Sequence, residues 1–185
     1  MNKVLLPVLV FFLLCNSCIA QIKYPKSFEK HNGKKIAKLY NSIGIDVPKN
    51  WFFGPKDPYH FNVTYTPKEF KNRDYTQLCS VHIKPYQLSN NSTELFLSEV
   101  SKLRQSYAQG FDDYKVIEES IDEESKQIDI TYTYFFKNKP IKGMTRYVHT
   151  GQSLYMITYL GGKKQYEMYF NEGMSIVNSF RIKKN

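Results

Sequence analysis

Apolar and polar residues alternate along the stretch 40–51, and this pattern predicts where the fold begins. Ile43, Ile45 and Val47 are separated by polar or small neighbours, which is the period-two pattern of a half-buried strand. A proline ends the alternation just before Trp51, the only tryptophan in the chain. We therefore predict that Tyr40–Trp51 is the first strand and that the Trp51 ring is buried.

Two further alternating stretches, 61–65 and 78–86, predict a second and a third strand, and a helix follows them. Ser92 is a candidate N-cap, and Gly110 is a candidate end of the helix. Between them, apolar residues recur at spacings of four, three and four: Phe96, Val100, Leu103 and Tyr107. One face of this helix is therefore expected to pack on a sheet.

Short connections join the next four predicted strands. The patterned stretches are 114–118, 127–136, 141–149 and 153–160. Turns of a few residues between such stretches are typical of an antiparallel meander. After two glycines, residues Tyr166 to Val177 show helical spacing, so we predict one closing helix, in which Gly173 costs about 1 kcal/mol relative to alanine.

Two short motifs and the order of these elements give the chain a family resemblance. Gly44–Trp51 reads Gly-Ile-Asp-Val-Pro-Lys-Asn-Trp, and the closing helix finishes in Asn178-Ser179-Phe180. With a central helix and a meander between them, these motifs resemble the PsbP-like superfamily, which includes PsbP and Ran-binding Mog-type proteins. The resemblance covers Leu39–Ile182. It implies an α+β fold, an α/β/α sandwich whose central antiparallel sheet is flanked by helices, and it implies binding or assembly rather than catalysis.

The first twenty residues have the pattern of a secretory signal peptide. Lys3 precedes an apolar run, Val4 to Leu14, and Ala20 ends a segment of small residues. The run is about half of the ~20 residues that a membrane-spanning helix needs, so we predict no transmembrane segment. Cleavage after Ala20 is favoured, and lipidation of Cys18 is the alternative. Either outcome makes the protein extracytoplasmic, secreted or periplasmic.

The sequence therefore divides into three predicted segments. These are a signal peptide at 1–20, a mobile lysine-rich extension at 21–38 and a single PsbP-like domain at 39–185.

The charge of the chain is strongly positive, with a formal net charge of +9 at pH 7. The lysines form short clusters, including 137–142 and 163–164, rather than one stripe. Because a nucleic-acid surface needs a continuous basic footprint, and because the chain is expected to be exported, we predict no nucleic-acid partner. Attraction to anionic cell-surface material is the expected consequence of the charge.

Cys79, His82 and His149 are the candidate reactive residues. With the leader removed, Cys79 is the only cysteine, so no intramolecular disulfide can form, and we favour a buried packing role for it. No two histidines have the spacing of a helix-borne metal pair. We predict no metal, no cofactor and no catalytic residue, and the alternative is a site where these three residues converge from neighbouring strands.

Two other features of the composition have simple structural explanations. The acidic run 118–124 lacks the glycine and the alternating oxygen ligands of a calcium loop, so we interpret it as the solvated end of a hairpin. Aromatic residues make up 16% of the chain, with tyrosines expected along both faces of the strand Tyr132–Phe136. A sheet buried under helices on both faces is favoured over an aromatic-lined binding groove.

These observations predict an exported, non-enzymatic binding or assembly module whose unidentified partner is a protein or a component of the cell envelope. The alternative is a small-ligand-binding protein or an enzyme with a site around Cys79, His82 and His149. The sequence does not indicate an oligomeric state.

Overall fold

The computed structural model describes residues 43–53, 63–70 and 79–183, which form an α+β fold dominated by antiparallel strands. The predicted leader, the extension 21–38, Cys18 and Leu78 lie outside the described residues. The elements are β1 (Ile43–Gly44), β2 (Trp51–Phe53), β3 (Val63–Pro67), the 3₁₀ turn η1 (Lys68–Phe70), β4 (Ser80–Gln87), α3 (Thr93–Gly110), β5 (Asp112–Asp122), β6 (Gln127–Phe136), β7 (Lys139–Thr150), β8 (Ser153–Gly162), α4 (Lys163–Met168), α5 (Phe170–Asn178) and β9 (Arg181–Ile182).

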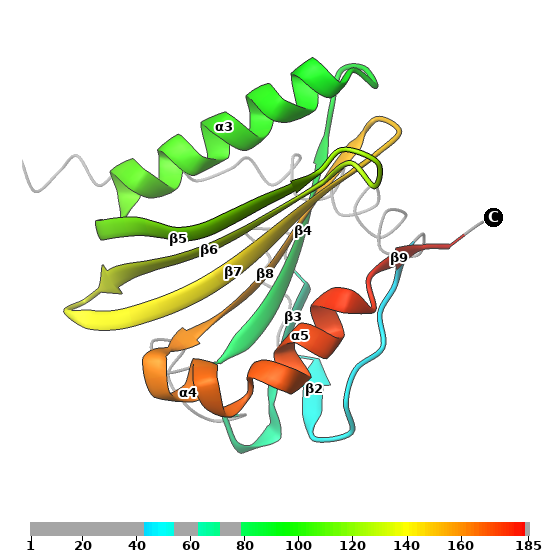
Figure 1. The fold of residues 1–185 in the computed structure, drawn as a ribbon. Coiled ribbons are helices and arrows are strands. Elements are labelled where there is room, and N and C mark those ends of the chain that lie inside the picture. Colours follow the sequence, from blue (N-terminus) through cyan, green and yellow to red (C-terminus); the bar gives the residue numbers. More distant parts are fainter. Residues whose placement is uncertain (1–42, 54–62, 71–78, 184–185) are drawn as a thin grey trace, which may run out of the picture.

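Seven strands form one antiparallel sheet in the order β2-β3-β4-β8-β7-β6-β5 (Figure 1). Strands β5 to β8 are neighbours in both sequence and space, so the predicted meander is confirmed. The β6–β7 turn contains Lys137 and Asn138, both at positive φ (50° and 61°). Two successive left-handed residues match the twist of a tight hairpin, and asparagine tolerates that conformation well.

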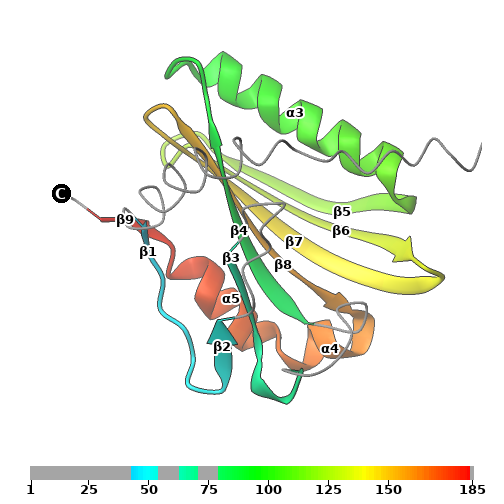
Figure 2. The same ribbon diagram turned by 180° about the vertical axis from the view of Figure 1, so that it is seen from behind.

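The helices lie on both faces of the sheet. Helix α3 lies over one face, and α4 and α5 lie over the other (Figures 1 and 2). Successive residues of the central strand β8 therefore enter different cores: Ile157 and Tyr159 pack under α5, whereas Leu154 and Met156 pack under α3. Because both faces of β8 are covered, its sequence is almost continuously apolar.

Helix α3 begins and packs as predicted. The Ser92 hydroxyl accepts a hydrogen bond from the backbone N–H of Leu95 at 3.1 Å, which satisfies one of the unpaired donors of the first turn. Phe96 and Val100 are buried beneath the helix, and Leu103 and Tyr107 pack beside them. The helix ends with Gly110, and the next residue, Phe111, donates its N–H back to the Tyr107 carbonyl.

The predicted first strand is wrong in its extent. Of 43–51, only Ile43–Gly44 forms a strand before β2 begins at Trp51, and that strand pairs with β9 instead of joining the large sheet. The reason lies at Asp46, whose backbone N–H donates to the Ser179 hydroxyl at 2.9 Å rather than to a neighbouring strand. Trp51 is nevertheless 3% exposed, so its predicted burial is confirmed.

The predicted single closing helix is also wrong, because it is divided at Tyr169 into α4 and α5. The backbone of Tyr169 leaves the helical region (φ −106°, ψ 15°). In this position its ring makes edge contacts with Trp51 and Phe70, at centroid distances of 6.2 and 5.8 Å. The break therefore joins α4–α5 to the strands at the opposite end of the sequence.

The Asn178-Ser179-Phe180 motif attaches the end of α5 to three other parts of the chain. Asn178 accepts a hydrogen bond from Arg146 on β7, Ser179 contacts Asp46, and the Phe180 ring packs against Tyr155 on β8. The next residue, Arg181, forms a two-bond ion pair with Asp46 at 2.8 and 2.9 Å. We refer to the β1–β9 pair and the Asp46–Arg181 ion pair together as the end clasp.

Candidate binding surface

The structure does not bring Cys79, His82 and His149 together. Cys79 faces the core under α5, while His82, three residues later along the chain, hydrogen-bonds side chains on the α3 face. His149 stacks on Phe96 of α3 at a centroid distance of 5.0 Å, on a strand separated from β4 by β8. The alternative site predicted from these three residues is therefore not formed.

Cys79 is an inert core residue, as favoured from the sequence. It is fully buried, and its thiol donates a hydrogen bond to the Tyr159 hydroxyl at 3.2 Å. Burial raises the pKa of the Cys79 thiol to about 12, an effect that outweighs the hydrogen bond. Since the thiolate is the nucleophile, a thiol with this pKa is unreactive near neutral pH.

His82 makes the contact that comes nearest to catalytic geometry. Its Nε2 lies 2.8 Å from the Ser80 hydroxyl, and its Nδ1 lies 3.0 Å from the Thr64 hydroxyl. A serine–histidine contact resembles an activated nucleophile, and the Thr64 hydroxyl lies at the other ring nitrogen, where a Ser-His-Asp triad has its carboxylate. Ser80 is also only 3% exposed. The Ser80–His82 contact could have been found from the sequence, because residues two apart on a strand point to the same face.

The polar contact at His82 continues across the sheet as a row of hydroxyl groups. Thr158 lies directly opposite His82, and Thr145 lies opposite Thr158. The two threonine hydroxyls are 2.9 Å apart, and the Tyr132 hydroxyl lies 3.1 Å from Thr145. These buried groups satisfy one another's hydrogen bonds, which explains why a polar row is tolerated inside the fold.

The tyrosines of β6 lie on one face rather than on both faces, which corrects the sequence prediction. Tyr132 and Tyr134 are buried on the α3 side, where Tyr107 and Phe111 stack on them. The favoured interpretation, rings buried between sheet and helix, holds for this cluster. The last two residues of β6 are not buried in this way, because Phe135 and Phe136 are 40% and 39% exposed.

Strand β5 is one of the two edge strands of the large sheet, and it leaves apolar side chains uncovered. Val116, Ile117 and Ile121 are 41%, 59% and 59% exposed. Val116 and Ile121 pair with the buried Tyr132 and Ile128, so they face the same side of the sheet as α3.

Leu97 of α3 adds a fourth exposed apolar side chain to this region, at 44%. It precedes Arg104 by two helical turns and so shares its side of the helix, and Arg104 forms an ion pair with Glu119 of β5 at 2.8 Å. Leu97 and Ile121 therefore lie along the same line between helix and edge strand. We call Leu97, Val116, Ile117 and Ile121 the α3–β5 seam.

Two lysine clusters that are separate in the sequence lie at the same end of the sheet in the structure. Ile141 of β7 pairs with Gly162 of β8, and this register brings the β6–β7 turn beside the start of α4. We call the resulting surface the basic tip. Its residues are Phe135, Phe136, Lys137, Lys139, Lys163 and Lys164.

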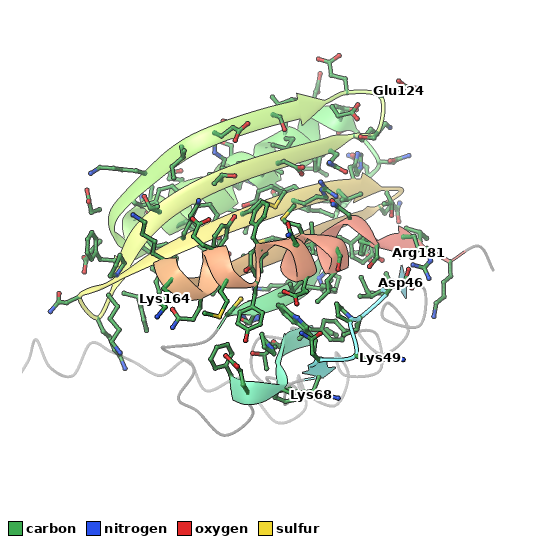
Figure 3. The ribbon with its side chains drawn as sticks, turned by 60° about the horizontal axis from the view of Figure 1, so that its bottom comes forward. Asp46, Lys49, Lys68, Glu124, Lys164 and Arg181 are labelled. Atoms are coloured by element: carbon green, nitrogen blue, oxygen red, sulfur yellow. The ribbon has the colours of Figure 1, made fainter. Side chains whose placement is uncertain are left out.

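The acidic run lies at the other end of β6. The turn that follows β5 contains Glu123 and Glu124, and Asp122 accepts hydrogen bonds from the backbone of Glu124 and Ser125. This geometry confirms a solvated hairpin end. Figure 3 shows Glu124 and Lys164 on opposite sides of the molecule.

Two other kinds of feature are absent from the described residues. Among residues 43–53, 63–70 and 79–183, no group of three histidine, cysteine or acidic side chains is arranged to hold a metal ion. In the same residues, no helix combines the length and apolar character needed to cross a bilayer.

Comparison with known proteins identifies the fold. No family model and no curated protein matches the sequence. The solved structure of LpqN, involved in cell envelope biogenesis of Mycobacterium tuberculosis, is similar with a TM-score of 0.57 at 8% identity, over 77% of this chain and 83% of that chain. The solution structure of cyanobacterial PsbP (CyanoP) from Synechocystis is similar with a TM-score of 0.51 at 8% identity, over 77% and 88%.

The Ran-binding protein Mog1p of Saccharomyces cerevisiae aligns over 78% of this chain and 92% of its own length, at 9% identity, with a lower TM-score of 0.47. The LpqN and CyanoP structures show that the chain has a PsbP-like fold, so the fold implied by the resemblance of Gly44–Trp51 and Asn178–Phe180 is confirmed. At these identities the likeness concerns the fold alone.

Proposed function

We propose that the protein is an exported, non-enzymatic binding or assembly module, built as an α/β/α sandwich, that engages a protein partner along the α3–β5 seam. The observation that carries this proposal is an edge strand of eleven residues whose apolar side chains are uncovered. An edge strand presents backbone N–H and C=O groups to which another strand can add, and flanking apolar side chains add contact area.

The irregularity of β5 restricts where a partner strand can pair. The register shifts between Asp112 and Lys115 and again between Val116 and Glu118, and it is regular from Glu118 to Asp122. Bulges of this kind twist an edge and limit pairing to the regular part. We therefore place the partner segment along Glu118–Asp122, next to Ile121 and Leu97.

The charge of β5 favours a basic partner over a second copy of the chain. The strand has one lysine and five acidic residues: Asp112, Asp113, Glu118, Glu119 and Asp122. Two copies paired edge to edge would bring like charges together, which is destabilising. An extended segment carrying lysine or arginine would instead complement this edge.

Export is supported by the sequence pattern of residues 1–20, and it places the partner in the cell envelope or outside the cell. The burial of Cys79 and of Ser80, which are 0% and 3% exposed, supports the non-enzymatic part of the proposal.

The test is capture of envelope proteins by the processed chain and by two variants. The edge variant Glu118→Lys/Ile121→Ser reverses one charge and removes one exposed apolar side chain at the proposed surface. The control variant Glu69→Lys/Met168→Ser makes the same two kinds of change at exposed positions away from β5.

We expect a partner retained by the wild type and by the control variant to be lost from the edge variant. Equal retention by all three proteins would show that the seam is not the binding surface. Turnover of hydrolase or redox substrates by the purified protein, with no partner retained, would overturn the proposal as a whole.

A further inference from the structure

The basic tip has a chemistry unlike that of the α3–β5 seam. Phe135 and Phe136 end strand β6, and the turn begins immediately after them with Lys137. Adjacent strand residues point to opposite faces, so the hairpin exposes one ring on each side. The Lys137 ammonium lies 5.6 Å from the centre of the Phe136 ring, within the range of a cation–π contact.

The charge of this end remains positive after its ion pairs are counted. Lys142 pairs with Glu167, and Lys115 pairs with Asp113, so these four charges cancel. Among the described residues, Asp112, which lies opposite Phe135, is the acidic neighbour that remains. Four lysines of the tip are exposed and form no ion pair within the described part of the chain: Lys137, Lys139, Lys163 and Lys164. Against Asp112 they leave an excess of three positive charges.

The two ends of β6 differ in sign, which gives the molecule a preferred orientation near a charged surface. Asp122, Glu123 and Glu124 lie at one end, and the tip lysines lie at the other. Ten strand residues separate them by roughly 30 Å, which exceeds the screening length at physiological salt. An anionic surface would therefore attract the tip and repel the acidic turn.

We propose that the basic tip docks the protein on an anionic phospholipid bilayer, with the lysines at the headgroups and the two phenylalanine rings in the interfacial layer. A bilayer matches both features of the tip, because negative headgroups attract lysine and the layer beneath them accepts apolar rings. A hydrated anionic polymer matches the lysines but offers no apolar phase to the rings. This docking is independent of the protein partner proposed for the seam.

The test is co-sedimentation of the processed protein with vesicles of neutral phosphatidylcholine and with vesicles containing 30% phosphatidylglycerol. We expect binding to the anionic vesicles alone, weakened by salt. Lys137→Gln/Lys139→Gln should lower the vesicle affinity roughly 20- to 30-fold, since each lysine near such a surface contributes about a factor of five. The matched control is Lys49→Gln/Lys68→Gln, which removes two exposed lysines far from the tip and should change affinity much less (Figure 3).

A second pair of variants separates a bilayer from other anionic partners. Phe135→Ser/Phe136→Ser should lower vesicle affinity about tenfold or more, whereas Ile121→Ser, at a 59% exposed position on the seam, should not. Circular dichroism of each variant establishes that it is folded. Unchanged vesicle binding by the phenylalanine variant, equal loss from both lysine variants, or binding to soluble dextran sulfate with no binding to anionic vesicles would each overturn the proposal.

Discussion

Replacing Gly173 by alanine should destabilise the fold, although helix propensity alone predicts the reverse. A Cβ atom at this position in α5 would lie 2.4, 2.5 and 2.7 Å from three atoms of the Tyr159 ring. Ordinary contact requires about 3.4 Å or more, so the ring would have to move by about 1 Å. Tyr159 has little freedom to do so, because it is fully buried and its hydroxyl donates to the Tyr166 carbonyl at 2.7 Å.

The magnitude follows from three terms. Overpacking in a close-packed core costs about 1–3 kcal/mol, and weakening the Tyr159 hydrogen bond costs about 1 kcal/mol more. In the opposite direction, alanine stabilises a helix by about 1 kcal/mol relative to glycine. We therefore expect Gly173→Ala to lower the free energy of unfolding by about 1–3 kcal/mol. This reverses the expectation from the sequence, in which Gly173 was a cost to the helix.

The assay is urea unfolding followed by the fluorescence of Trp51, the only tryptophan, whose buried ring reports the loss of the core. Gly110→Ala is the matched control, because no atom lies within 4 Å of the added Cβ at the end of α3. This control should be neutral or stabilised by up to about 1 kcal/mol. If Gly173→Ala were as stable as Gly110→Ala, the close packing of Tyr159 against α5 would be refuted.

Three other perturbations test separate parts of the fold. Trp51→Ala should cost about 3–5 kcal/mol in urea unfolding followed by circular dichroism, since Trp51 is 3% exposed, and a near-wild-type midpoint would contradict its place in the core. Ser92→Ala should cost about 1 kcal/mol by removing the α3 N-cap, whereas Ser175→Ala, mid-helix in α5, should cost less. Burial, with a smaller contribution from Lys126, lowers the pKa of His149 below 6.5, so its contribution to stability is complete above pH 6.5 and decreases as the pH falls below that value. Unfolding of His149→Phe between pH 7.5 and 5 should therefore depend less on pH than that of the wild type, and an equal dependence would contradict the shift.

Features that depend on neighbouring residues could be predicted from the sequence. The N-cap at Ser92 and the buried residues of α3 follow from side-chain chemistry and helical spacing within a few turns. The meander follows in the same way, because short turns leave successive strands little choice of partner. The sequence also allowed the prediction that Cys79 and His82 lie on opposite faces of the sheet, because residues an odd number apart on a strand point to opposite sides.

Features that depend on register between distant segments could not be predicted. The pairing of Ile43 with Ile182 and the meeting of Ile141 with Gly162 are set by the whole sheet. The first pairing ended the predicted strand early, and the second assembled the basic tip from two lysine clusters. The low helix propensity of glycine gave the wrong expectation for Gly173 for the same reason. The ring that leaves no room for a larger side chain belongs to Tyr159 of β8, which lies outside α5 and is not visible from the local sequence.

The end clasp determines how the domain would respond to a mechanical load. Ile43 is the first residue of β1 and pairs with Ile182, the last residue of β9. Tension applied at the two ends of the domain would therefore act on the same end of this antiparallel pair and separate the strands from that end. The hydrogen bonds would then break one after another instead of together, and the Asp46–Arg181 ion pair would carry the load next. We expect the clasp to open at low force, while the seven-stranded sheet remains folded and its outer surfaces remain intact.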